Sequence, residues 1–306
     1  MIKDFAEIDS LASQMPPLRL VALSADEREF LLTLKIACER GYITPVIVGG
    51  GEKLKRTADE ITLDLSQIEI IETKDPQAIA DTGISMFFNG DVDIAMKGHI
   101  PTAFVYRSII RQEKALGRKG NIAVNTFWDI PGAGHLVTIT DTGVSIRPDL
   151  QTKREIIRDA VDLMHLFGYP RPRVLVLSAQ SLSDESPRSL QDALALREDA
   201  ARGRLGECEV LPATTLWGAM APRDEIDEEP FRVDTGKTPH IFVVPHLDAG
   251  NILSKLDFIL DVTRRSIVMT SKGPVIIPSR SDIHPTLVGE VALGAVVTHL
   301  RKGALR

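Results

Sequence analysis

The sequence has few cysteines and no long apolar runs, which excludes several classes of protein. Only two of the 306 residues are cysteines, Cys38 and Cys208, and their separation forms no metal-binding motif. Cys38 falls on the apolar side of a predicted helix, so we interpret it as a small buried hydrophobe rather than a nucleophile. No apolar run approaches the roughly 20 residues that cross a bilayer, and acidic residues interrupt the N-terminal stretch where a signal peptide would be apolar. We therefore expect a cytoplasmic protein without a membrane partner.

Several catalytic signatures are also missing. No H-E-x-x-H, paired-cysteine or clustered-carboxylate pattern predicts a metal site, and no G-x-S-x-G turn indicates a serine hydrolase. Gly49-Gly50-Gly51 follows a predicted strand, but nothing nearby completes a G-x-G-x-x-G fingerprint, so we interpret it as a turn. A net charge of −6 argues against a general nucleic-acid-binding surface.

What the sequence does contain is an alternation of short apolar runs and amphipathic stretches, which predicts an α/β fold with a mostly parallel sheet. The length of 306 residues favours two domains or one large doubly wound domain. Strands are predicted at 18–23, 46–48, 68–71, 94–96, 123–127, 135–140, 174–177, 242–244, 266–269 and 275–277.

Helix boundaries follow from capping residues. Ser24 and Glu27 predict a capping box for a helix that runs to Arg40, and Asp75 with Pro76 predicts the start of another. Further helices are predicted near 102–113, 150–167, from Pro187 and from Pro285 to about 301. The segment 211–239 is rich in acidic residues and proline and is predicted to be an irregular loop.

The stretch Phe242–Leu256 (FVVPHLDAGNILSKL) is the one around which we organise the interpretation. It predicts a buried strand, a stop at Pro245 and then a helix. His246 can exchange a proton, Gly250 allows close backbone approach and Lys255 brings a positive charge. Strand-to-helix turns of this kind bind anions in open α/β sheets, although most of them are only structural.

Other predicted strands also end in polar residues, and these are mostly cationic or hydroxylic although the protein is acidic. This bias predicts an anionic substrate, for which phosphate is the best match. Arg107 is the least certain member, because it is equally well explained as a solvated helix residue. The set comprises Lys97, Arg107, Asp141, Ser178, Asn251, Lys255, Ser279, Arg280 and Asp282.

Four stretches together resemble the phosphate acetyltransferase/phosphate butyryltransferase family, with a closer likeness to the butyryltransferase branch. They are P-x-L-x-A-G-N-I-L-x-K around Gly250, Met96-Lys97-Gly98, Thr140-Asp141-Thr142 and Ser279-Arg280-Ser281-Asp282. The resemblance implies reversible transfer of a short acyl group, such as butyryl or acetyl, between coenzyme A and orthophosphate. It implies that both are substrates, that no cofactor is tightly bound and that the protein is a homodimer.

The resemblance also implies two α/β/α domains with a cleft between them, of the isocitrate/isopropylmalate dehydrogenase-like type. Because the Ser279–Asp282 turn is expected to reach Lys97, the tail is assigned to the first half of the chain. Since Arg147-Pro148-Asp149 interrupts the succession of predicted strands and helices, we place a domain boundary there. We expect one domain to comprise 1–147 plus 267–306 and the other 148–266.

Site roles follow from the matching positions. Arg280 is assigned to a phosphate or acyl-phosphate oxygen, and Ser279 to the reacting thiol or the oxyanion. The residues expected to bind substrate are Lys97, Gly98, Thr102, Arg107, Asp141, Asn251 and Lys255.

The catalytic base is assigned by elimination. Acetyl-specific members resemble one another in having an aspartate where this chain has Thr286, and a hydroxyl is too weak a base. The butyryl-like branch has an acid at the position of Asp282. We favour Asp282 as the base or as the group that orients Ser279, with His246 second, while His284 can serve as a helix cap.

Two alternatives remain open. A metal- and nicotinamide-dependent decarboxylating dehydrogenase has a similar G-N-I-L-S-D string, but here Lys255 follows Ser254 and would repel the metal. A catalytically weak paralogue that binds acyl phosphate or coenzyme A as a sensor is the other alternative.

Overall fold

The computed structural model describes residues 1–118, 122–179, 187–220 and 238–304. These residues form two compact α/β units. We call Phe5–Ile122 with Arg265–Arg306 the Lys97 unit, and Met1–Asp4 with Ala123–Arg264 the His246 unit. Within the described residues, no helix has the length and apolar character needed to span a membrane.

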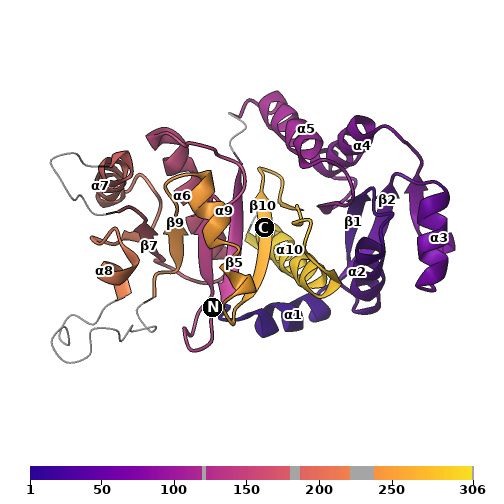
Figure 1. Cartoon of the computed structure of the whole chain (residues 1–306), viewed down its shortest axis with the longest axis horizontal. Coiled ribbons are helices and arrows are strands. Elements are labelled where there is room, and N and C mark those ends of the chain that lie inside the picture. The colour runs from indigo at the N-terminus through magenta and orange to yellow at the C-terminus, as the bar shows by residue number, and fades with distance from the viewer. Residues whose placement is uncertain (119–121, 180–186, 221–237, 305–306) are drawn as a thin grey trace. The chain divides into compact units, whose positions relative to one another are not determined.

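The sheet of the Lys97 unit has the strand order β3-β2-β1-β4-β11-β10. Its strands run in parallel except for the antiparallel pair β10–β11. Helices α4 and α5 pack together over one face, and α10 packs against α1 and α2 over the other (Figure 1). The strands are β1 (Leu18–Leu23), β2 (Ile43–Val48), β3 (Glu69–Ile71), β4 (Ile94–Lys97), β10 (Thr263–Met269) and β11 (Pro274–Ile276). The helices are α1 (Phe5–Gln14), α2 (Arg28–Glu39), α3 (Glu52–Glu60), α4 (Pro76–Asn89), α5 (Thr102–Ala115) and α10 (His284–Ala304).

Helix α10 is the core helix of this unit. All its residues from Leu287 to Thr298 are buried, because it is apolar on nearly every side and packs against α1, α2 and β11. The buried carboxylate of Glu290 accepts a hydrogen bond from the Ser266 backbone N–H at 2.9 Å. The C-terminal tail is thereby fixed within the Lys97 unit.

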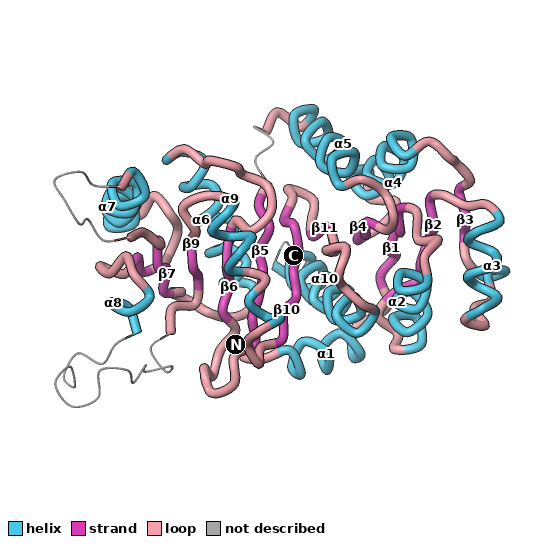
Figure 2. Tube along the Cα trace, viewed as in Figure 1, coloured by secondary structure: helices cyan, strands magenta, loops and turns pink. Residues whose placement is uncertain are grey.

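The His246 unit has the strand order β5-β6-β9-β7-β8, in which only the β5–β6 pair is antiparallel. Trp128, Ile139, Leu175 and Phe242 belong to its hydrophobic core. The chain trace in Figure 2 shows these strands between the helices of the unit. Its elements are β5 (Ala123–Asp129), β6 (Val137–Thr140), α6 (Leu150–Leu166), β7 (Arg173–Val176), α7 (Arg188–Ala201), β8 (Glu209–Val210), α8 (Leu216–Met220), β9 (Ile241–Val243) and α9 (Leu247–Leu253).

The predicted α/β class is confirmed, and each predicted strand has a counterpart in the structure. The Asp75 cap is also confirmed, since its carboxylate accepts from the Ala78 N–H. The capping box at Ser24 is wrong: α2 begins at Arg28 with no side-chain cap, and Ser24 has a left-handed backbone with φ of 58°. Part of the predicted irregular loop, 221–237, lies outside the described residues, and α8 occupies another part.

The compact units divide the chain after Ile122, whereas the sequence analysis placed the boundary after residue 147. The reason is strand pairing, because β5 pairs with β6 and β6 pairs with β9 of the His246 unit. The stretch Arg147-Pro148-Asp149 instead directly precedes α6, and Asp149 is the N-cap residue of that helix. The tail returns to the Lys97 unit at Arg265, two residues before the predicted position.

A buried histidine pair lies in the His246 unit. The His135 and His240 rings are 4.5 Å apart between centroids, and Tyr169 packs on His240 at 4.9 Å. The Arg173 backbone N–H donates to Nδ1 of His240 at 2.8 Å. Burial, followed by the charge of Arg173, lowers the pKa of His240 from 6.5 to about 3, and burial lowers the pKa of His135 as well.

We predict that acid destabilises the His246 unit through this pair. Both histidines are neutral when folded, so below pH 6.5 the unfolded chain binds protons that the folded chain does not, and stability falls as the pH falls toward 3. Each such histidine contributes a slope of about 1.4 kcal/mol per pH unit. His240→Asn keeps an acceptor for the Arg173 N–H but cannot titrate, so its slope should be smaller.

Urea unfolding at pH 7, 6 and 5 checks this prediction. Tryptophan fluorescence is a suitable signal, because both tryptophans, Trp128 and Trp217, lie in the His246 unit. Equal pH slopes for the wild type and His240→Asn would contradict the prediction.

Candidate functional site

Three parallel strands of the Lys97 unit end at the same edge of the sheet. Leu23 of β1 is paired with Lys97 of β4, and Ile276 of β11 is paired with Met96. The turns that follow these strands therefore lie side by side. They carry Ser24, Lys97-Gly98 and Ser279–Asp282, so two of the predicted motifs meet at this edge.

The first two turns approach each other at the backbone. The Gly98 N–H donates to the Leu23 carbonyl oxygen at 2.8 Å, and the His99 N–H donates to the Ser24 carbonyl oxygen at 2.7 Å. A Cβ on Gly98 would lie 2.3 Å from the Ser24 oxygen, which is a clash with backbone. Gly98 is therefore required for the close approach, and the left-handed backbone of Ser24 is part of the same arrangement.

Lys97 is a buried cation at this edge. Its side chain is 6% exposed, and its ammonium donates to the Gly98 carbonyl oxygen at 3.2 Å. Burial, followed by the positive charge of Arg280, lowers the pKa of Lys97, while Asp282 and Glu27 act in the opposite direction. The positive charges of Lys97 and Arg280 thus oppose each other, and an anion that binds both would relieve this repulsion.

The Ser279–Asp282 turn is held by its own carboxylate. The Ser279 N–H donates to Oδ2 of Asp282 at 2.7 Å, while the Ser279 and Ser281 hydroxyl oxygens are 3.3 Å apart. Arg280, between them, is exposed. Asp282 therefore accepts a hydrogen bond within the turn that contains Ser279 and Arg280, and its role in catalysis stays a prediction.

The start of α10 anchors this turn to α2. His284 donates its backbone N–H to Oε2 of Glu29 at 2.7 Å, and its Nδ1 lies 2.9 Å from the same oxygen. Hydrogen bonds from His284 lower the pKa of Glu29. The His284 ring thus contacts the Glu29 carboxylate of α2, and its predicted role as a cap of its own helix stays a prediction.

Thr102 and Arg107 lie on α5, which follows β4. Thr102 is the first helical residue. Arg107 is exposed, donates to Oε1 of Gln77 on α4 at 2.9 Å and lies 5.5 Å over the Phe104 ring. Its contacts are therefore on α4 and α5, and its role in substrate binding stays a prediction.

In the His246 unit, Asp141 organises the loop after β6. Its Oδ1 accepts from the N–H groups of Val124, Gly143 and Val144, and its Oδ2 accepts from that of Ser145, at 2.7–3.1 Å. Asp141 is 3% exposed, so these four bonds satisfy most of its acceptor capacity.

Helix α9 packs directly on the loop of Asp141. A Cβ on Gly250 would lie 2.5 Å from the Asp141 carbonyl oxygen. Asn251 in this helix is exposed and Lys255 beyond it is partly buried. The two motifs of this unit, Thr140-Asp141-Thr142 and the Gly250 stretch, are therefore adjacent.

His246 caps α9. Its Nδ1 accepts from the Ala249 N–H at 3.4 Å, and the side chain is exposed. A ring whose Nδ1 accepts carries its proton on Nε2, which makes His246 a donor toward a ligand. This tautomer favours Asp282 over His246 in the assignment of a base.

Neither cysteine has the environment of a nucleophile. Burial raises the pKa of both the Cys38 and the Cys208 thiols to about 11. Within the described residues, no group of histidine, cysteine or carboxylate side chains could hold a metal ion.

Sequence reasoning missed Ser24, Arg147 and Arg188. Ser24 was interpreted as a helix cap, although it directly follows β1. Arg147 was interpreted as a domain boundary, although it lies between β6 and α6. Arg188 is the first residue of α7. The sequence predicted a helix from Pro187 but no role for Arg188.

Comparisons with known proteins identify relatives over the whole chain. A family model described as "Phosphate acetyl/butaryl transferase" matches residues 77–295. A phosphate acetyltransferase of Rhizobium meliloti is 30% identical over 97% of this chain and 94% of its own length. A phosphate butyryltransferase of Clostridium beijerinckii is 27% identical over 99% of this chain and 100% of its own. The structure of a phosphotransacetylase from Streptococcus pyogenes superposes with a TM-score of 0.78 at 14% identity, covering 96% of this chain and 98% of that one, which shows a shared fold.

Gly98→Ala should destabilise the Lys97 unit by about 1–3 kcal/mol, because the new methyl group meets backbone that cannot move without disturbing β1. Gly303→Ala in α10 is the control, since its Cβ would meet nothing within 4 Å and alanine favours a helix. Urea unfolding followed by circular dichroism measures both. A Gly98→Ala protein as stable as Gly303→Ala would show that the close approach is not required.

Proposed function

The chain belongs to the phosphate acetyl/butyryltransferase family, and we propose that it moves a short-chain acyl group reversibly between coenzyme A and orthophosphate. The observation that supports this most is the pair of cations, Lys97 and Arg280, at one edge of the Lys97 sheet. Orthophosphate is the substrate whose charge such a pair compensates. The family membership supplies the acyl-coenzyme A that the phosphate attacks.

The reaction sets three demands on the chain. A phosphate oxygen attacks the thioester carbonyl carbon, the carbon–sulfur bond breaks, and the departing thiolate takes up a proton to become the coenzyme A thiol. Phosphate must be held beside the carbonyl, the tetrahedral oxyanion needs donors, and in the reverse direction the thiol must lose its proton.

Lys97 and Arg280 hold the phosphate. The two cations repel each other when the site is empty, and this repulsion is what lowers the pKa of Lys97 in addition to burial. A bound dianion removes the repulsion, so phosphate binding should raise the pKa of Lys97. Orientation of the nucleophile then follows from two fixed donors rather than one.

Ser279 donates to the developing oxyanion or to the sulfur, and Asp282 positions it. The hydrogen bond from the Ser279 N–H to Asp282 fixes the direction of the turn from which the Ser279 hydroxyl and the Arg280 guanidinium extend. Asp282 is therefore proposed as a positioning residue in the first place and as a base in the second.

The substrate-binding roles of Gly98, Thr102, Arg107, Asp141, Asn251 and Lys255 are part of the same proposal. Gly98 acts through backbone approach and Asp141 through the loop beside α9. A dehydrogenase-like two-domain arrangement, a homodimer and a cytoplasmic location also stay predictions. Asp282 together with Thr286 favours the butyryl-like branch, while the relatives include both acetyl and butyryl enzymes.

Release of free thiol from acetyl-coenzyme A and butyryl-coenzyme A tests the function. Release should require orthophosphate, yield one acyl phosphate per thiol and reverse when acyl phosphate and coenzyme A are supplied. A purified, folded chain that releases no thiol from any short-chain acyl-coenzyme A in the presence of phosphate would refute the proposal.

Arg280→Ala should raise the KM for phosphate by about tenfold to a hundredfold, which corresponds to about 1.5–3 kcal/mol for lost charged hydrogen bonds. Arg202→Ala is a matched control, because within the part of the chain that the structure describes this exposed arginine forms an ion pair only with the exposed Glu198 on α7, at 3.4 Å. Steady-state kinetics with phosphate as the varied substrate give the result. An unchanged KM in an active Arg280→Ala enzyme would remove Arg280 from the phosphate site.

Two variants of Asp282 separate positioning from proton transfer. Asparagine can still accept from the Ser279 N–H, so a positioning role predicts a loss of kcat below tenfold for Asp282→Asn and a larger loss for Asp282→Ala. A base contributes about 10²–10⁴-fold, so equal losses of a hundredfold or more in both variants would assign that role to Asp282 instead. His246→Asn, which keeps the cap on α9, is measured beside them.

A further inference from the structure

The His246 unit contains a pocket of its own at the carboxyl ends of its parallel strands. The pocket has a volume of about 430 Å³ and includes among its lining residues Arg147, Lys153, Arg188, Ser189, Asp192 and His246. These residues follow three strands, since Arg147 lies between β6 and α6, Arg188 between β7 and the body of α7, and His246 between β9 and α9. Convergent strand-to-helix turns are the usual ligand position in an α/β sheet.

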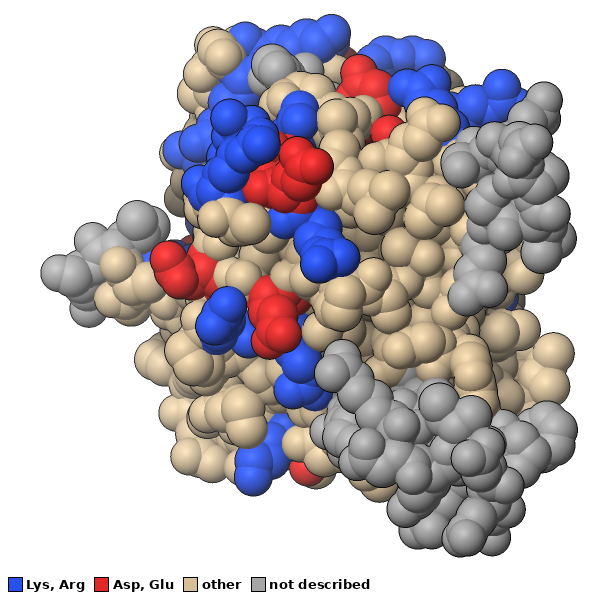
Figure 3. Space-filling model, turned by 90° about the vertical axis from the view of Figure 1, so that its left-hand side faces the viewer, with Lys and Arg blue, Asp and Glu red and all other residues tan. Residues whose placement is uncertain are grey.

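The charge of the pocket is positive. Lys153 and Asp192 are buried and paired at 2.7 Å, so they neutralise each other. Arg147 and Arg188 are exposed, and neither has an ion-pair partner among the residues that the structure describes. On the side of the molecule where α7 and α8 lie in Figure 1, basic side chains gather along one margin of the surface with fewer acidic ones among them (Figure 3).

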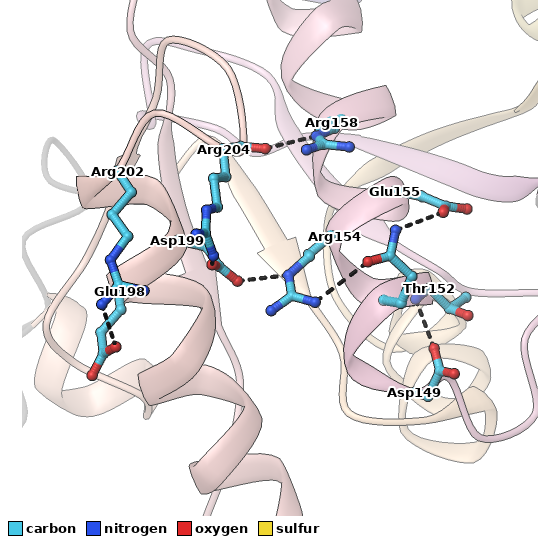
Figure 4. A network of polar contacts seen from close by, with 10 residues as sticks. Asp149, Thr152, Arg154, Glu155, Arg158, Glu198, Asp199, Arg202 and Arg204 are labelled. Atoms are coloured by element: carbon cyan, nitrogen blue, oxygen red, sulfur yellow. Dashed lines mark hydrogen bonds and ion pairs between the residues drawn. The ribbon is translucent and has the colours of Figure 1, made fainter.

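Side-chain contacts join α6 to α7 and to the turn that follows α7. Arg154 on α6 donates to Oδ2 of Asp199 on α7 at 2.6 Å, and Arg158 donates to the carbonyl oxygen of Arg204 at 2.7 Å. Figure 4 shows both contacts beside the cap of α6, in which Asp149 accepts from the Thr152 N–H. The two helices are thereby joined to each other, and the start of α7 has no side-chain cap.

His246 adds an imidazole N–H donor. Because its Nδ1 accepts from the Ala249 N–H, its Nε2 carries the proton, and the exposed ring also lines the pocket. Two guanidinium groups and an imidazole N–H are donors of the kind that bind the oxygens of a phosphate group.

We propose that this pocket is a second anion site that binds the phosphate group of a phosphate ester or pyrophosphate. The residues of this pocket belong to the His246 unit, whereas Lys97 and Arg280 belong to the other unit. Two sources carry this chemistry: the phosphates of coenzyme A, an assignment that rests on the proposed function, and a separate phosphorylated small molecule. In both cases the phosphate that reacts with the acyl group binds in the Lys97 unit.

Calorimetric titration of the full chain tests the site. The probes are coenzyme A, dephospho-coenzyme A and inorganic pyrophosphate, and the background is Arg280→Ala, which weakens the anion site of the Lys97 unit. Arg147→Gln and Arg188→Gln should each raise the Kd of at least one probe tenfold or more, and the double variant should raise it further. Arg202→Gln, at the C-terminal cap of the helix that begins with Arg188, should change each Kd less than twofold.

The pattern among the probes identifies the source. If the variants lose affinity for coenzyme A but not for dephospho-coenzyme A, the pocket binds the 3′-phosphate. If they lose affinity equally for both, the pocket binds the pyrophosphate of coenzyme A. A loss confined to inorganic pyrophosphate assigns a separate ligand. A double variant that binds every probe as the Arg280→Ala background does overturns the proposal.

Failure of the proposed function gives a different result. Titration needs no acyl transfer, so a chain that binds probes through Arg147 and Arg188 but releases no thiol refutes acyl transfer and leaves the anion site standing. Thermal unfolding confirms that the glutamine variants are folded, which is expected because both arginines are exposed.

Discussion

The site depends on the approach of two backbone turns at the ends of β1 and β4. Gly98 lies so close to Ser24 that a methyl group has no room, and two backbone hydrogen bonds fix the contact. Because β11 is in register with β4 on its other side, the Ser279–Asp282 turn is brought to the same edge. The proposed chemistry depends on this contact and on the buried Lys97 at the end of β4, whose pKa the charge of Arg280 lowers.

Electrostatics then give the edge its specificity. A cation that is 6% exposed costs free energy unless it is compensated, and here a second cation increases the cost while Asp282 and Glu27 reduce it. A phosphate dianion completes the compensation. An acidic protein with a net charge of −6 can therefore bind an anion tightly, because the relevant charges are those that strand pairing brings together.

The parts of the fold and site that could be predicted are those determined by short stretches. Lys97 and Ser279–Asp282 lie at or after the ends of apolar runs that are recognisably strands. The cap at Asp75 involves only residues of the first turn of α4, so it can be predicted from that turn. Ser24 was misinterpreted because a serine before a glutamate also caps helices, and only its contact with Gly98 explains its left-handed backbone.

Features that depend on tertiary packing were not predictable in the same way. The division after Ile122 follows from pairing of β6 with β9, about a hundred residues later in the chain. The pocket lined by Arg147 and Arg188 lies where the buried Lys153–Asp192 pair joins α6 to α7. No local pattern near either arginine contains that information, whereas a motif shared with a family can indicate a site before its geometry is known.

The central claim is that Lys97 and Arg280 share an anion at the strand edge of the Lys97 unit. A crystal structure of the protein grown in orthophosphate tests it most directly. The account predicts a tetrahedral anion within hydrogen-bonding distance of both the Lys97 ammonium and the Arg280 guanidinium, with Asp282 still accepting from the Ser279 N–H. A well-ordered Lys97–Arg280 edge without an anion, in crystals that bind phosphate elsewhere, would contradict it.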